Sequence, residues 1–107
     1  VQKIQANYWF MLGEQLSGQE RHDRAQPAYE RAAEVAPSSR TIHYNVAVML
    51  LKQNKLEAAW THLESALDLD PLRPEFYRLG TRLLRQQRRF AAADALHKKA
   101  VRIGRIP

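Results

Sequence analysis

Histidine is the side chain in this sequence best suited to bind a metal ion or to move a proton near neutral pH. The chain has four, His22, His43, His62 and His97, and no cysteine. No histidine stands three or four residues from another, so the usual helical pair of zinc ligands is missing. The four glycines are scattered and form no phosphate-binding loop, and no nucleophile stands beside a candidate base. The sequence therefore predicts no metal site, no catalytic residue and no cofactor, and the protein is not expected to be an enzyme.

Positive charge gathers in the last third of the chain. The sequence carries 17 Lys and Arg against 11 Asp and Glu, a formal net charge of +6, and residues 74–107 supply most of the excess. The cations there are Arg78, Arg82, Arg85, Arg88, Arg89, Lys98, Lys99, Arg102 and Arg105. Such a tract suits an acidic protein partner, and it also attracts phosphates by charge alone. The spacing of i+4, i+3 and i+4 from Arg78 to Arg89 is equally typical of the solvated face of a helix. Nucleic acid or an anionic membrane is the least favoured of these alternatives.

The stretch from residue 41 to residue 71 predicts two short amphipathic helices that form a hairpin. Apolar residues recur at helical spacing in each half, and the polar segment at 52–55 is too short for anything but a turn between antiparallel helices. Pro71 ends the second helix, because proline disfavours the helical conformation of the residue before it.

The same unit repeats along the chain at a constant spacing. Its marker positions in the first unit are Trp9, Leu12, Gly13, Leu16, Ala25, Tyr29, Ala32 and Pro37. Adding 34 to each number gives the equivalents His43, Val46, Ala47, Leu50, Ala59, Leu63, Ala66 and Pro71. In the third unit Ala93 and Ala100 keep this spacing, whereas four markers stand one position early, namely Phe76, Leu79, Gly80 and Leu83. We therefore expect one extra residue in the turn at 85–90 and a slightly irregular third repeat.

With these markers, residues 6–103 resemble the tetratricopeptide repeat (TPR) family. The resemblance implies an all-α, right-handed superhelical solenoid of antiparallel helix pairs, with about six helices in three repeats at 6–39, 40–72 and 73–107. These would form a single domain, 1–107, and the start at Val1 suggests a fragment of a longer protein. The departures are His43 in place of a large apolar residue, His97 at the Tyr29 position, and Arg105 where a third proline would fall. His43 and His97 are expected to be core residues with structural hydrogen bonds.

Small residues at the helix contacts allow close packing of paired helices. Gly13, Ala47 and Gly80 are expected to face Ala25, Ala59 and Ala93, with Ala32, Ala66 and Ala100 serving the following repeat. Pro27 is an anomaly, since it lies within the second helix of the first repeat. It predicts a late or bent start for that helix, with Asp23 as its cap.

The resemblance also implies a concave surface, lined by the first helix of each repeat, as the place where a partner binds. The groove residues chosen on this basis are Phe10, Met11, Glu14, Tyr44, Asn45, Val48, Lys52, Tyr77, Arg78 and Arg85. Ser17, Gly18, Leu51, Thr81 and Leu84 occupy further positions of the same surface. Phe10, Tyr44 and Tyr77 form an aromatic ladder that suits a helix or an extended peptide. The alternative is that these rings pack as ordinary core.

Chaperone-binding TPR proteins hold a terminal carboxylate in a clamp of Lys, Asn and Arg. The first-repeat positions of that clamp are Phe10 and Glu14 here, and a third-repeat lysine position is Pro74. Only Asn45 and Arg78 match. The sequence therefore does not predict binding of chaperone carboxyl-terminal tails.

The predicted function is a protein-interaction module that binds a peptide or helix of a partner in the concave surface, and the charge suits an acidic one. A structural or self-assembling segment of a larger scaffold is the alternative, because Phe90, Leu96, Ala100 and Ile103 would leave an apolar flank partly bare for a neighbouring repeat or a second copy. Nucleic-acid binding by the third repeat is the least favoured. No apolar run approaches the ~20 residues of a transmembrane helix. We expect a soluble protein, cytoplasmic or, in a bacterium, periplasmic, and the sequence does not decide the compartment.

Overall fold

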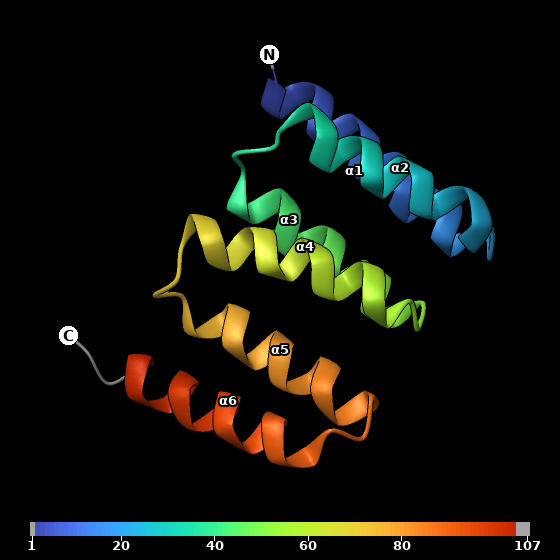
Figure 1. Cartoon of the computed structure of the whole chain (residues 1–107). Helices are drawn as coiled ribbons and strands as arrows, with labels where there is room; N and C mark the ends of the chain where they lie inside the picture. Colours follow the sequence, from blue (N-terminus) through green and yellow to red (C-terminus); the bar gives the residue numbers. More distant parts are fainter. Residues whose placement is uncertain (1, 105–107) are drawn as a thin grey trace.

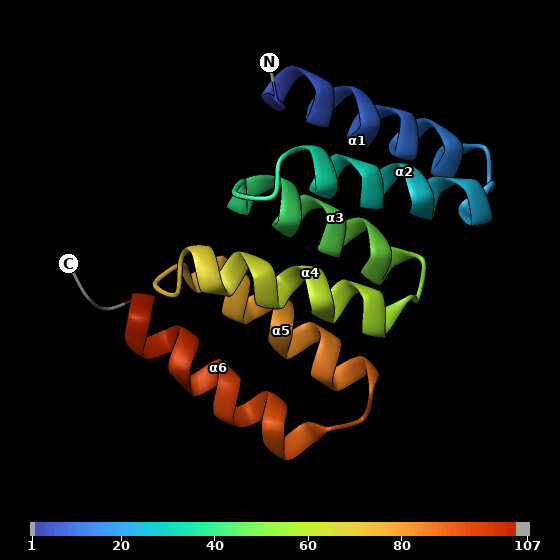
Figure 2. The same cartoon turned by 45° about the horizontal axis from the view of Figure 1, so that its top comes forward.

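The chain folds into stacked helix pairs. In the computed structural model, which describes residues 2–104, the elements are α1 (Gln2–Gly18), α2 (His22–Val35), α3 (Arg40–Lys52), α4 (Leu56–Leu69), α5 (Pro74–Gln86) and α6 (Phe90–Gly104). Neighbouring helices run antiparallel, and the pairs follow one another from α1 and α2 at one end of the stack to α5 and α6 at the other (Figures 1 and 2). Residues 2–104 contain no strand. The all-α solenoid of antiparallel helix pairs is confirmed.

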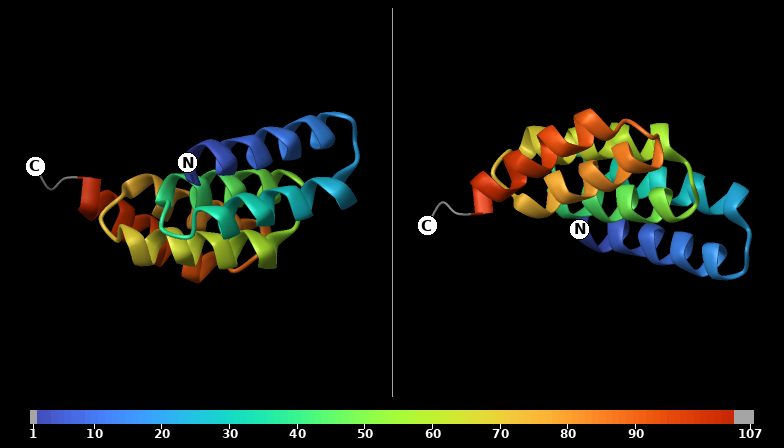
Figure 3. Two further views of the ribbon diagram at one scale, coloured as in Figure 1. Left: turned by 90° about the horizontal axis from the view of Figure 1, so that it is seen from above. Right: turned by 90° about the horizontal axis from the view of Figure 1, so that it is seen from below.

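The first helices of the pairs share one side of the stack. Besides the contacts within each pair, α1 contacts α3 and α3 contacts α5, while α2 and α4 each contact the first helix of the next pair. Successive pairs are rotated relative to one another, as the two views along the stack show (Figure 3). The helices α1, α3 and α5 therefore line the concave surface of a right-handed superhelix.

The third helix pair has the same spacing as the first two. A three-residue turn joins the helices of every pair, and the left-handed residue of the turn recurs with the 34-residue period, as Glu20, Asn54 and Arg88. The extra residue expected at 85–90 is not there, so the prediction of an irregular third repeat is wrong.

Tyr77, and not Phe76, occupies the position that His43 has in the second pair. The Tyr77 hydroxyl donates to the carbonyl oxygen of Pro71 at 2.6 Å, as Nε2 of His43 donates to that of Pro37 at 2.9 Å. The sequence comparison selected Phe76 because α5 is buried over an unusually wide face, which consists of Phe76, Tyr77, Leu79, Gly80, Thr81, Leu83 and Leu84. So wide an apolar face satisfies the repeat pattern in two registers, one residue apart.

Close packing at small residues holds each pair together. All the small residues expected at helix contacts are buried. A Cβ added to Gly13 would lie 2.5 Å from a ring carbon of Tyr29, and one added to Gly80 would lie 2.6 Å from a methyl of Leu96. The nearest neighbour of each glycine is thus a large side chain of the paired helix, and not Ala25 or Ala93 as expected. Gly80 also faces Leu63 and Trp60 of α4, in the preceding pair. Glycine lets a ring or a methyl group rest directly on the backbone of the first helix.

Pro27 does not delay the start of α2. The helix begins at His22, in register with the starts of α4 and α6, and Asp23 lies in its first turn without capping it. The predicted late start and the predicted cap are therefore wrong, and a bend at Pro27 stays a prediction. Proline has no N–H for the carbonyl of Asp23, but Pro27 and Asp23 are not buried, so water can serve that carbonyl instead.

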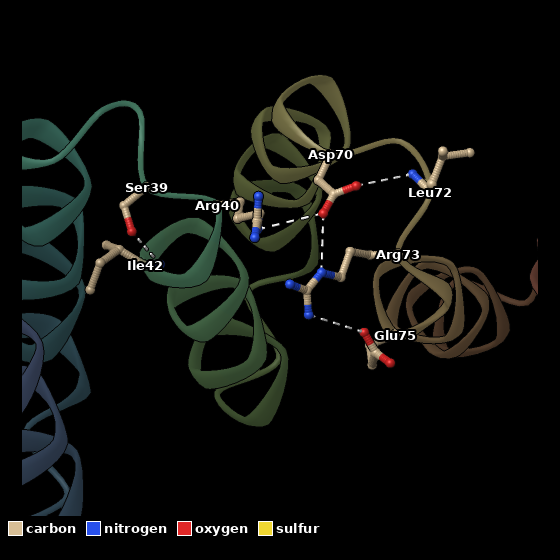
Figure 4. A network of polar contacts seen from close by, with 7 residues as sticks. All are labelled: Ser39, Arg40, Ile42, Asp70, Leu72, Arg73 and Glu75. Carbon is tan, nitrogen blue, oxygen red and sulfur yellow. Dashed lines mark hydrogen bonds and ion pairs between the residues drawn. The ribbon is translucent and has the colours of Figure 1, made fainter. Parts of the chain in front are cut away.

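A carboxylate network ties the second pair to the third. Asp70, after α4, accepts hydrogen bonds from the backbone N–H of Leu72 at 3.3 Å and from Nε of Arg73 at 3.1 Å (Figure 4). Arg40, at the start of α3, pairs with the same carboxylate at 3.5 Å. Removal from water opposes ionisation of Asp70, but the bonds from Arg73 and Leu72 and the charges of Arg40 and Arg73 outweigh it and lower the pKa of that carboxyl.

Candidate functional site

The 34-residue spacing fixes which residues share a row on the concave surface. Phe10, Tyr44 and Arg78 are equivalent across α1, α3 and α5. The next rows are Met11, Asn45 and Leu79, then Glu14, Val48 and Arg82, then Ser17, Leu51 and Arg85, and last Gly18, Lys52 and Gln86. The aromatic ladder expected from the sequence therefore consists of Phe10 and Tyr44 alone, and Arg78 takes the third position.

Tyr77 lies behind the concave surface. Its side chain is only 5% exposed, its hydroxyl is bound to Pro71, and the ammonium group of Lys99 from α6 lies 5.2 Å from the centre of its ring. Tyr77 packs between α5 and the outer helix α6, so a bound peptide cannot reach its ring. The prediction that Tyr77 lines the groove is therefore wrong. In the register that α5 adopts, the Tyr77 side chain lies behind the concave surface.

Phe10 and Tyr44 are both half-buried. Phe10 packs against Tyr29 of α2 with ring centres 5.5 Å apart, and Tyr44 packs against Phe76 of α5 at 5.2 Å. Each ring thus contributes to the core with one face. The Tyr44 ring also borders a hollow of about 270 Å³, so part of it remains open to a ligand.

This hollow lies between α3 and α5 on the concave surface. Its lining consists of Tyr44, Glu75, Arg78, Leu79 and Arg82. It combines an apolar floor with two guanidinium groups and one carboxylate. Arg82 was predicted only as part of the basic tract, and its place on the concave surface is what the sequence argument missed. The uniform 34-residue period, which places Arg82 in the row of Glu14 and Val48, could have found it.

Positive charge on α5 is poorly compensated. Arg78, Arg82 and Arg85 are exposed. Arg78 lies 3.9 Å from Glu75 at an exposed site, where an ion pair stabilises little. Among residues 2–104, neither Arg82 nor Arg85 has an acidic side chain within ion-pair distance. The third-repeat part of the surface therefore carries a net positive charge.

The remaining predicted groove residues are dispersed. Val48 and Asn45 are half-buried, and Lys52 and Glu14 are exposed. Met11 is exposed and borders a separate hollow of about 390 Å³ along the middle of α1, together with Tyr8, Leu12 and Gln15.

The further positions predicted for this surface differ in their burial. Leu51, Leu84 and Thr81 are buried, and Thr81 donates to the carbonyl of Tyr77. Ser17 accepts a hydrogen bond from Gln53 in the turn of the second pair, and Gly18 is exposed.

The histidines divide into a buried pair and two exposed residues. His43 and His62 are buried and face each other. His22 and His97 are exposed, so the expectation of a core position for His97 is wrong. Its equivalents Tyr29 and Leu63 are fully buried, and Leu63 lies against Gly80 of the next pair, whereas no helix follows α6 among the described residues. No cluster of three or more metal-binding side chains occurs in that part of the chain.

Both ends of the stack expose apolar side chains. Tyr8 of α1 is 60% exposed, whereas its equivalents Ile42 and Phe76 are 4% exposed, because a preceding helix pair covers them. At the other end, Phe90 and Val101 of α6 are exposed.

The bare flank of α6 differs in part from the one expected. Ala100 is buried, and Leu96 and Ile103 are half-buried. An apolar hollow of about 510 Å³ lies instead along α6, lined by Ala95, His97, Lys98, Val101 and Arg102. Arg105, predicted as part of the basic tract, lies outside the described residues.

The sequence profile of one family, described as tetratricopeptide repeat, matches residues 10–74. Because the match covers more than half of the sequence, and the structure has the helix pairs of that family, the chain belongs to the tetratricopeptide repeat family. Proteins of this family are non-catalytic modules for protein–protein interaction. No curated protein sequence matches the chain significantly.

Several solved structures share the fold. The N-terminal domain of stress-induced protein-1 (STI-1) from C. elegans matches with a TM-score of 0.83 at 18% identity, over 100% of this chain and 90% of that chain. The second TPR of Spaghetti (RPAP3), bound to the HSP90 peptide SRMEEVD, has a TM-score of 0.75 at 19% identity and 94% coverage of both chains. A MamA structure labelled MSR-1 has a TM-score of 0.78 at 21% identity, covering 92% of this chain and 57% of that one, so this chain spans little more than half of MamA. At these identities the likeness shows the fold alone.

No helix among the described residues is both long and apolar enough to cross a membrane.

Proposed function

We propose that this chain binds an acidic segment of a partner protein along its concave surface, by equilibrium binding and without catalysis. The observation that carries the proposal is the hollow beside Tyr44, which is lined by Tyr44 and Leu79 together with two arginines, Arg78 and Arg82, and one acid, Glu75. An apolar pocket with a few converging polar groups is the usual form of a ligand site. The family supplies the general role, and the arginines supply the preference for a negatively charged ligand.

The chemistry of the surface defines the form of the ligand. An apolar side chain of the partner would enter the hollow against Tyr44 and Leu79, while a neighbouring carboxylate would bind the Arg82 guanidinium, whose planar donors match a carboxylate. Asn45, which follows Tyr44 in α3 and is half-buried, would bind the partner's backbone with its amide. Lys52 and Arg85 would extend the positive field along the groove.

A chaperone tail of the kind bound by the RPAP3 repeat is not the proposed ligand. With Tyr77 at the Trp9 position, the clamp residues of the third repeat become Glu75 and Leu79. Asn45 is then the one remaining match. Four of the five clamp positions thus lack the residue that holds a terminal carboxylate, so the proposed ligand is an internal acidic segment whose carboxylate binds Arg82.

The test is a pull-down from a nuclease-treated lysate with three forms of the protein. The groove variant Tyr44→Ala, Arg82→Ala is compared with the wild type and with Arg88→Ala, Arg89→Ala, which removes two exposed charges in the turn before α6. All three must unfold cooperatively. We expect one partner that the wild type and the turn variant retain and the groove variant loses. Equal retention by the groove variant would show that the concave surface is not the site. A partner that leaves the protein together with nucleic acid when the lysate is treated with nuclease would show that charge alone is responsible for the binding.

The bare ends of the stack support a second candidate function, head-to-tail assembly with further copies of the chain. The exposed end of α1 is equivalent to faces of α3 and α5 that are buried inside the stack, as Tyr8, Ile42 and Phe76 show. A second copy that placed α6 on α1 would repeat the internal contact, and such a heterologous contact extends without closing. We expect the sedimentation coefficient to rise with concentration for the wild type but not for Tyr8→Glu. A coefficient that stays constant at the monomer value would exclude this assembly.

A further inference from the structure

Two buried histidines meet where the first helix pair packs on the second. Nδ1 of His43, from α3, lies 3.4 Å from Nδ1 of His62, from α4, and the rings are inclined by 30° with their centres 5.7 Å apart. Both side chains are 7% exposed. Neither histidine has a part in the concave surface, and nothing in the repeat pattern requires either.

The outer nitrogen of each ring is committed as a donor. Nε2 of His43 lies 2.9 Å from the carbonyl oxygen of Pro37, and Nε2 of His62 lies 3.1 Å from Oε2 of Glu30. A carbonyl oxygen and an ionised carboxylate only accept hydrogen bonds, so both Nε2 atoms carry hydrogen. In two neutral rings both Nδ1 atoms would then be bare, with their lone pairs directed at each other.

The number of protons between the rings decides whether this contact attracts or repels. With no proton on either Nδ1, two acceptors face each other in a buried site, and neither forms a hydrogen bond. With a proton on each Nδ1, two positively charged rings face each other, donor to donor. With one, the charged ring donates Nδ1–H to the bare Nδ1 of its neighbour, and the carboxylate of Glu30 balances the charge. We propose that His43 and His62 form a proton-binding site that holds one proton, with Glu30 as its counter-ion.

The charged groups on the surrounding helices leave Glu30 as the partner of this proton. On α2, Arg31 pairs with Glu34 at 3.2 Å and lies 6.0 Å from the centre of the Trp9 ring. On α3, Arg40 pairs with Asp70, and on α4 the acids Glu57 and Glu64 are exposed. The acid of α1, Glu14, and the acid of α5, Glu75, are also exposed. Within residues 2–104, the ion pair between His62 and Glu30 is the one that reaches either ring.

The third repeat shows what the same site looks like without a proton. Tyr77 and Leu96 stand at the positions of His43 and His62, and Tyr77 keeps the hydrogen bond to its proline carbonyl. Tyrosine and leucine therefore fit this position of the repeat with no ionisable nitrogen between them. In the second repeat the proton joins α2, α3 and α4, so its loss weakens the contact between the first two helix pairs.

The test counts ring protons by ¹⁵N nuclear magnetic resonance of the histidines as a function of pH. We expect His43 and His62 to show three ring N–H protons between them, and to lose or gain a proton at the same pH in both rings. His22 and His97, which are exposed, serve as internal controls. In Glu30→Gln the third proton should be lost at lower pH, because the counter-ion is gone. Bare Nδ1 atoms in both rings at every pH where the protein is folded would overturn the proposal.

Stability supplies a second readout. The matched variant is His43→Tyr, His62→Leu, which installs the pair of the third repeat. The singly protonated pair stabilises the fold, so the wild type should lose stability relative to this variant both above the pH where the shared proton leaves and below the pH where a second one enters. A difference that is independent of pH between pH 5 and 9 would contradict a bound proton. Should the variant not fold, the proton count in the wild type decides alone.

Discussion

The contact between Gly13 and Tyr29 allows a sharp test of how the first helix pair is packed. In Gly13→Ala the new methyl would lie 2.5 Å from one ring carbon of Tyr29 and 2.6 Å from the next, and that ring is fully buried. Overpacking of this kind costs about 1–3 kcal/mol. Alanine in a helix interior gains about 0.8–1.0 kcal/mol over glycine. We expect a net destabilisation of up to about 2 kcal/mol.

Gly18→Ala is the matched control, because a Cβ there meets nothing within 4 Å. It should leave stability unchanged or raise it by up to about 1 kcal/mol. Gly18 is the last residue of α1, so its gain from alanine is at most that of Gly13, and the two variants should differ by at most the overpacking term of about 1–3 kcal/mol. In a domain of this size 1 kcal/mol shifts Tm by roughly 4–8 °C. Thermal unfolding followed by circular dichroism measures the difference. If Gly13→Ala were as stable as the control Gly18→Ala, or more stable, the close contact between Gly13 and Tyr29 would be refuted.

A double-mutant cycle then assigns the cost to the ring. The second repeat has Ala47 and Leu63 at the positions of Gly13 and Tyr29, and both are fully buried. Tyr29→Leu alone leaves an unfilled space above Gly13. In the double variant the alanine fills part of that space, so its loss of stability should be smaller than the sum of the single losses, by about 0.5–3 kcal/mol. Strict additivity would mean that the two side chains do not meet.

Three further predictions concern hydrogen bonds and pH. Tyr77→Phe removes the 2.6 Å bond to Pro71 and should cost about 0.5–1.5 kcal/mol in denaturant unfolding. Tyr29→Phe should be close to neutral, because the buried Tyr29 hydroxyl makes no well-formed hydrogen bond among the described residues and Ser17 interacts with it only weakly. Burial raises the pKa of the Tyr29 phenol, so the folded state holds its proton more tightly than the unfolded state, and the wild type should lose stability above about pH 10 where Tyr29→Phe does not. The pKa of Asp70 is lowered, so its contribution is present above the pKa of the unfolded state and lost as pH falls through the folded value. The stability gap between wild type and Asp70→Asn should therefore be open at pH 7 and close in acid.

The site was less predictable than the fold. Counting from the Trp9 position selected Tyr44, Asn45 and Arg78, which remain proposed groove residues. Arg78 stays among them although the sequence pattern places the third repeat one residue out of register. The same error placed Tyr77 in the groove and left out Arg82. Apolar periodicity located α5 correctly but not its rotation, because a helix buried on a wide face has no single apolar stripe to define it.

The 34-residue period, the helices, their pairing and the small residues between them could all be read from the sequence. These features are local, since each depends on residues within about one repeat and on the spacing of a helix face. Which of several equivalent positions stays open depends instead on the packing of distant segments. Tyr8 and Ile42 differ in exposure because Ile42 has a helix pair packed on it and Tyr8 does not. Folding also brings Glu30 to His62 across 32 residues, and with it creates a buried pair of histidines that the repeat pattern does not require.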